Sequence, residues 1–231
     1  FCLSRGLGDV YKRQLQIAVP SIISNITVPL LGLIDVTIVG HLGSPAYIGA
    51  IAVGGMLFNI IYWIFGFLRM GTSGMTSQAY GQHDLNEINR LLIRSVGVGL
   101  FIALCLLILQ YPILNAAFTL IQTTEEVKQL ATTYFYICIW GAPAMLGLYG
   151  FAGWFIGMQN SRFPMYIAIT QNIVNIIASL SFVYLLDMKV AGVAAGTLIA
   201  QYAGFFMAIL LYMRYYSTVS YTHLRAHETG R

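Results

Sequence analysis

Long apolar stretches separated by short polar segments dominate the chain. A helix needs about 20 mostly apolar residues to cross the hydrocarbon core of a bilayer, and six stretches reach that length. The pattern therefore predicts an all-α, polytopic membrane protein. The predicted membrane-spanning helices cover approximately residues 15–39, 48–76, 91–113, 131–158, 165–186 and 190–214.

The composition agrees with this class and excludes several others. Hydrophobic residues make up 58% of the chain and charged residues 9%, whereas soluble domains are about 25% charged. The net charge of +4 is spread along the chain and forms no basic cluster of the kind that binds nucleic acid. The three cysteines lack metal-ligand spacing, and the spans contain neither an H-E-x-x-H motif nor a Ser/His/Asp arrangement. We predict no enzyme activity, no resident metal, no organic cofactor and no nucleic-acid partner.

The two ends of the chain do not continue the membrane pattern. Residues 1–14 read FCLSRGLGDVYKRQ and residues 218–231 read TVSYTHLRAHETGR. Both resemble translated sequencing-adaptor DNA, so we exclude them from fold reasoning as artefactual extensions. Residues 15–217 are then the membrane part, and the chain is expected to be a fragment.

The positive residues in the loops predict an orientation. Cytoplasmic loops carry an excess of Lys and Arg. Lys128 and Lys189 lie on one predicted side, and five arginines lie on the other, which predicts that the arginine side is cytoplasmic. Six spans then place both ends of the membrane part in the cytoplasm, and the localisation we expect is a bacterial inner membrane. The five arginines are Arg69, Arg90, Arg94, Arg162 and Arg214.

The first predicted span contains an aspartate, Asp35, surrounded by apolar residues. A charge at the bilayer centre costs about 2.5–3.5 kcal/mol on insertion scales, so intramembrane acids usually face a protein interior or a water-filled cavity. Asn25, Pro29, Gly32 and Asp35 follow one another at steps of four, three and three, which places them on one helix face. Desolvation disfavours the charged carboxylate, so this face predicts a proton-exchanging site.

Two further spans carry polar residues on one face. Asn172, Asn175 and Ser179 are spaced for one side of the fifth span, and Thr197 and Gln201 are one turn apart on the sixth. Two interpretations stay open for each of them. The amides and hydroxyls can surround Asp35 or line a substrate cavity, or they can only hydrogen-bond helices together.

Aromatic residues and prolines have similarly open interpretations. Aromatic faces such as that of Tyr149 can hold organic cations, but aromatic residues also form ordinary interface belts. Pro20 and Pro143 predict helix bends, either beside a cavity or as packing kinks. The amphipathic segment 84–94 is expected to form a short interfacial helix that runs into the third span.

Three motifs in this order resemble one transporter family. Pro20 is followed by fourteen residues and then by Asp35 within IDVTIVGHLG. SQAYGQHD follows the second span, and QNIVNIIASLSFVYLLDMKVAGVAAGTLIAQY covers the fifth and sixth. Together they resemble the multidrug and toxic compound extrusion (MATE) transporters, and most of all their bacterial DNA-damage-inducible F (DinF-type) branch, over residues 15–214.

The resemblance implies an architecture and a function. MATE transporters have twelve helices in two six-helix lobes and exchange H⁺ or Na⁺ for cationic or amphipathic drugs. The chain would be the N-terminal lobe, embedded in the lipid bilayer and lacking its C-terminal partner lobe. The family's cation site carries over onto Asp35, Asn175 and Thr197, and its bending proline onto Pro20.

One position departs from the family pattern. Many members have a second acid one turn after the helix-five asparagine, where this chain has Ser179. A single-carboxylate proton site is therefore the simpler expectation, with Na⁺ as the other coupling ion. Asn25, Asn172, Gln201 and Tyr149 are the candidates for the substrate cavity. The alternatives are a lipid-linked-oligosaccharide or lipid flippase of the related superfamily and a structural or regulatory membrane subunit.

Overall fold

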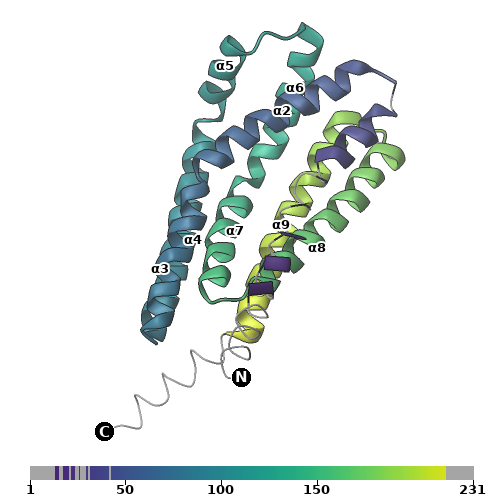
Figure 1. Cartoon of the computed structure of the whole chain (residues 1–231). Coiled ribbons are helices and arrows are strands. Elements are labelled where there is room, and N and C mark those ends of the chain that lie inside the picture. The colour runs from purple at the N-terminus through teal and green to yellow at the C-terminus, as the bar shows by residue number, and fades with distance from the viewer. Residues whose placement is uncertain are drawn as a thin grey trace.

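The computed structural model describes residues 14–15, 18–20, 22–23, 26, 30, 32–41 and 43–216, and helices are the regular structure in these ranges. Residues 32–40 are helical and precede α2. The predicted all-α class is therefore confirmed (Figure 1). The later helices are α2 (Pro45–Ile64), α3 (Gly66–Gly81), α4 (Leu85–Ile108), α5 (Gln110–Leu120), α6 (Glu125–Cys138), η1 (Ile139–Gly141), α7 (Ala142–Gly157), α8 (Arg162–Leu180), η2 (Ser181–Leu185) and α9 (Lys189–Tyr215).

Within the described ranges, five helical segments are long and apolar enough to cross a membrane. The first predicted span, 15–39, is described only in part, so a sixth span stays a prediction. The two terminal extensions lie outside the described residues, apart from Gln14. The five segments are Pro45–Gly81, Leu85–Ile108, Glu125–Gly157, Arg162–Leu185 and Lys189–Tyr215.

Several helix boundaries have a local cause. Asp84 caps α4, because its Oδ1 accepts a hydrogen bond from the backbone N–H of Glu87 at 3.0 Å. The predicted interfacial helix is thus the first part of one continuous α4. The α-helix is interrupted just before Pro143, because the 3-10 helix η1 lies between α6 and α7, in whose first turn Pro143 lies.

The helices form two packed groups along one bundle (Figure 1). The hairpin of α3 and α4 packs against α7, and α8 packs along α9. Helix α2 crosses α6, whose continuation through η1 joins the two groups. The helical residues 32–40 lie against this part of the bundle, which brings Asp35 close to α9.

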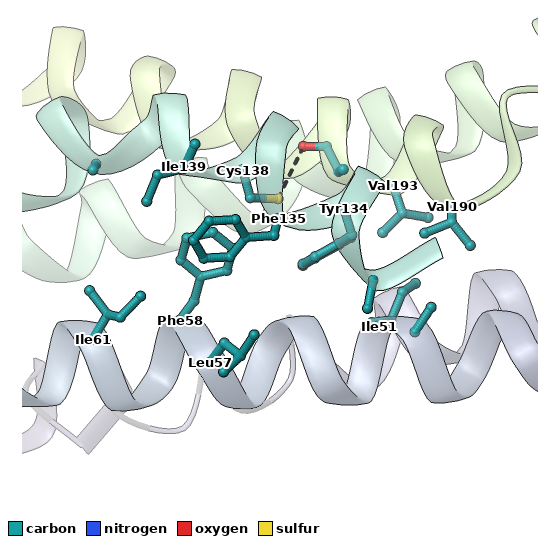
Figure 2. Packing of buried hydrophobic residues seen from close by; sticks show 14 of the residues in the cluster. Ile51, Leu57, Phe58, Ile61, Tyr134, Phe135, Cys138, Ile139, Val190 and Val193 are labelled. Atoms are coloured by element: carbon teal, nitrogen blue, oxygen red, sulfur yellow. Dashed lines mark hydrogen bonds between the residues drawn. The ribbon is translucent and has the colours of Figure 1, made fainter. Parts of the chain in front are cut away.

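Aromatic stacking fixes α2 against α6 (Figure 2). The rings of Phe58 and Phe135 stack with centroids 5.1 Å apart, and Tyr134 contacts Phe58 edge-on at 6.4 Å. On the other side of α6, the Cys138 thiol lies 3.7 Å from the carbonyl oxygen of Ala194 in α9. Helix α6 is therefore held between α2 and α9, which sets the wall of the cavity described below.

Close approach of α8 and α9 depends on Gly196. A Cβ atom at this position would overlap Ser179 Oγ and would lie 2.7 Å from the Ser179 backbone nitrogen. Small residues at such crossings allow membrane helices to pack backbone against backbone. Gly196 therefore holds Asn175 and Thr197, which lie on these two helices, at hydrogen-bonding distance.

We expect Gly196→Ala to lower the free energy of unfolding by about 1–3 kcal/mol, the usual cost of overpacking. The backbone of α8 is the obstacle, so side-chain rotation cannot relieve the overlap. Denaturation of the purified chain in detergent measures the change. Gly97→Ala on α4 is the control, because its Cβ would meet no atom within 4 Å. Equal stability of the two variants would contradict this packing.

Candidate functional site

Asp35 lies in the interior of the bundle. Its exposed fraction is only 3%, although Leu33, two residues earlier, is 66% exposed. The helix thus turns its acid inward and its large apolar residue outward, as its spacing requires. No cation pairs with the carboxylate within the part of the chain that the structure describes.

Thr197 is the centre of a hydrogen-bond network between three helical segments. Its Oγ1 lies 3.4 Å from Asp35 Oδ2 and accepts a hydrogen bond from Asn175 Nδ2 at 3.0 Å. The same hydroxyl lies 3.1 Å from the carbonyl oxygen of Val193, one turn earlier on α9. Asp35, Asn175 and Thr197, which the sequence predicts as one site, are therefore brought together.

The network can exist in two proton arrangements. A threonine hydroxyl has one proton to donate and can accept two hydrogen bonds. When Asp35 is protonated, it can donate to Thr197, whose own proton is then free for the Val193 carbonyl. When Asp35 is ionised, Thr197 must turn its proton to the carboxylate and release Val193. A change of charge at Asp35 therefore alters a contact within α9.

Three buried oxygens around this network have no hydrogen-bond partner among the described residues. They are Asp35 Oδ1, Asn175 Oδ1 and Ser179 Oγ. Asn175 and Ser179 are fully buried, one turn apart on α8. Unpaired oxygens at such depth are costly, so this region has spare acceptors for a proton, a water molecule or a cation.

A cavity of about 700 Å³ opens beside Asp35. Its walls come from residues 32–36, from one face of α2 and from Tyr134 of α6. Apart from the carboxylate, the lining is mostly apolar, with Met56, Ile60 and Trp63 on α2. A single acid in an aromatic, apolar cavity of this size suits a drug-sized organic cation.

Comparison with known proteins shows the family. The MatE family model matches residues 20–181, which is more than half of the chain. The chain belongs to the MatE family. The predicted family is thus confirmed, and the buried Asp35 network lies in the MatE fold.

The chain matches part of several longer relatives. The chain is 38% identical over 204 residues to DNA damage-inducible protein F of Escherichia coli, covering 87% of this chain and 44% of the relative. It is 28% identical over 204 residues to multidrug and toxin extrusion protein 1 of Danio rerio, covering 86% and 33%. A solved MATE structure in the bent conformation gives a TM-score of 0.82 at 21% identity, covering 90% and 46%. The chain spans less than half the length of these MatE relatives.

The chain contains a second cavity, of about 910 Å³, farther along α2 and α3. It contains Tyr149, one of the residues predicted to line a substrate cavity, together with Arg69 and Tyr62. Trp63 lines both cavities. Tyr149 is therefore separate from the Asp35 network, and the two cavities meet at Trp63.

Of the other predicted cavity residues, the described Asn172 and Gln201 line neither of these two cavities. Gln201 lies against Gly141 of η1, and its buried Oε1 has no partner among the described residues. Asn172 is half-buried on α8. Pro20 is buried and helical, and its role in bending the first helix stays a prediction. Asn25 lies outside the described residues.

Two of the residues with polar groups that line the Asp35 cavity, Tyr134 and Asn59, were not predicted as site residues. Tyr134 is buried beside Asp35 and Asn59 is exposed on the cavity face of α2. Tyr134 belongs to a run of aromatic residues that is also typical of an interface belt. The signal for Asn59 is its position as an amide in an otherwise apolar span.

Proposed function

We propose that the chain is the N-terminal lobe of a cation-coupled, most simply proton-coupled, multidrug efflux antiporter in a bacterial inner membrane. The observation that carries this proposal is the buried Asp35, which is linked through Thr197 to α8 and α9 and faces an apolar cavity. A protein named for multidrug and toxin extrusion is among the relatives. The N-terminus of the membrane part faces the cytoplasm in this proposal.

The coupling follows from competition for one carboxylate. An organic cation in the cavity is attracted to ionised Asp35, whereas a proton neutralises the carboxylate and removes that attraction. Protonation also returns the Thr197 hydroxyl to Val193, which couples the charge at Asp35 to the backbone of α9. Drug and proton then bind alternately, as an antiporter requires, and bending of the first helix near Pro20 changes access to the cavity.

A flippase for phosphate-bearing lipids is a weaker proposal. Such a protein would need several cationic residues in its cavity to bind phosphates. Among the described lining residues, those of the Asp35 cavity include no Lys or Arg, and those of the second cavity include one cation, Arg69. A structural or regulatory subunit would not need a titrating acid in its interior.

The coupling ion is tested with the full-length protein that carries this segment, reconstituted in liposomes. An acidic lumen without Na⁺ should drive uptake of ethidium, whose permanent charge prevents passive trapping by the pH gradient. A Na⁺ gradient at uniform pH should drive little uptake, because Ser179 leaves Asp35 without a second acid. Uptake driven only by Na⁺ would overturn proton coupling, and uptake driven by neither gradient would overturn the antiporter.

A further inference from the structure

The second cavity contains a positive charge that pairs with no carboxylate among the described residues. Arg69 of α3 is half-buried, and within the described ranges it forms no ion pair and no hydrogen bond. The ion pairs that the structure shows join Glu87 to Arg90 and Arg94 on α4. An arginine in a cavity offers five donors in a planar fork that matches carboxylate and phosphate groups.

Residues with hydroxyl groups line the same cavity as Arg69. Tyr62 is 8% exposed, and its hydroxyl oxygen is buried with no hydrogen-bond partner among the described residues. Its ring meets that of Tyr149 edge-on with centroids 6.5 Å apart. Ser73, one turn beyond Arg69, also lines the cavity. Arg69, the two tyrosines and Ser73 therefore line one space, and the buried Tyr62 hydroxyl beside it has a proton without an acceptor among the described residues.

The depth of the cavity fits an amphiphile. Along α7, Gly150 meets Ser95 of α4, and Gly153 meets the backbone of Arg69. Arg69 thus lies near the level at which α4 changes from its charged start, which includes Arg94, to an apolar run. From this level the cavity continues toward Trp63 and Phe67, which are 83% and 59% exposed.

The Arg69 charge lies in a different cavity from Asp35. Asp35 lines only the first cavity and Arg69 lines only the second, although Trp63 lines both. We propose that the cavity between α2, α3 and α7 binds the anionic headgroup of an amphiphile, with Arg69 and the Tyr62 and Tyr149 hydroxyls on the headgroup and Trp63 and Phe67 on the apolar body.

Trp63 allows a direct binding test, because it lies in the cavity wall. The purified chain in neutral detergent is titrated at mildly alkaline pH with a brominated fatty acid, which quenches nearby tryptophans, and with a brominated alkyltrimethylammonium of equal length. Because Trp63 lines both cavities, quenching that disappears in Trp63→Phe and persists in Asp35→Asn belongs to the second cavity. The carboxylate should bind roughly tenfold more tightly than the cation, the effect of one charged hydrogen-bonding partner.

Arg69→Gln should weaken carboxylate binding roughly tenfold or more and leave binding of the ammonium compound within about twofold. Arg162→Gln is the matched control, because Arg162 is exposed at the start of α8 and lines neither cavity. Equal effects of the two substitutions, or equal affinity for the two amphiphiles, would overturn the proposal. If Arg69→Gln does not fold, Tyr62→Phe tests the same site and should weaken carboxylate binding a few fold.

The source of the amphiphile is distinguished in lipid nanodiscs. Brominated phosphatidylglycerol should quench Trp63 more than brominated phosphatidylcholine if the ligand is a membrane lipid, and the fatty acid should then fail to displace it. Displacement by the fatty acid identifies a free amphiphile. Asp35→Asn should leave both the lipid preference and the displacement by fatty acid unchanged. Failure of the antiporter proposal and failure of this one are therefore distinguishable. Equal binding of anionic and non-anionic amphiphiles, both in the nanodisc and in detergent, would overturn the proposed site.

Discussion

Asp35→Asn is expected to reduce proton-driven uptake of ethidium to the level of protein-free liposomes. Asparagine has nearly the same shape as aspartate and can donate to Thr197 through its amide, which reproduces the protonated arrangement. It can neither ionise nor release a proton. The variant is therefore held in one of the two states that coupling requires.

This loss should occur without loss of fold. Asp35 is 3% exposed and unpaired within the described residues, so removing its charge removes a desolvation cost and leaves no orphaned partner ion. Asp187→Asn is the control, because Asp187 is exposed and its φ of 50° suits asparagine. Full transport by Asp35→Asn, or unfolding of that variant, would contradict the assigned role.

The charged part of the site could be predicted from the sequence for a physical reason. Buried acids and amides in a membrane span are rare because they are costly, so Asp35 and Asn175 stand out in apolar surroundings. Helical spacing gives the face on which each lies, and the resemblance to MATE transporters indicates which faces meet. The structure brings Asp35, Asn175 and Thr197 together as expected.

The remaining features depend on information that spacing does not contain. Gln201 shares a face with Thr197, yet it packs against Gly141 because η1 crosses α9 at that level. The cavity at Arg69 arises where α2 ends and α3 begins, at Phe65, and its tyrosines are indistinguishable in sequence from an aromatic belt. By contrast, the apolar spacing of residues 84–94 predicted a helix there, and in the structure Asp84 caps its start.

The largest loss of stability is expected for Trp154→Ala. Trp154 of α7 is 1% exposed, and its ring lies 5.6 Å from that of Tyr212 and 4.9 Å from that of Tyr216, both edge-on. Its Nε1 donates a hydrogen bond to the carbonyl oxygen of Ile88 on α4 at 2.9 Å. One side chain thus joins α7 to α4 and to the end of α9.

Lipid already provides an apolar environment, so transfer from water contributes less here than in a soluble core. The packing that is lost and the cavity that remains still carry a cost. We expect about 3–5 kcal/mol in the free energy of unfolding, the usual range for truncating a buried tryptophan to alanine. Trp154→Phe keeps most of the volume and should cost about 1 kcal/mol for the lost hydrogen bond.

Denaturant titration of the purified chain in detergent, followed by loss of helical circular dichroism, measures these differences. Trp140→Ala is the matched control, because Trp140 is 55% exposed and its contact with Tyr202 uses the backbone carbonyl, which alanine retains. A small effect of Trp154→Ala, comparable to that of Trp140→Ala, would mean that the aromatic cluster does not hold these three helices together. Equal destabilisation by Trp154→Phe and Trp154→Ala would instead assign the stability to the hydrogen bond with Ile88, because only the alanine variant empties the space between α4, α7 and α9.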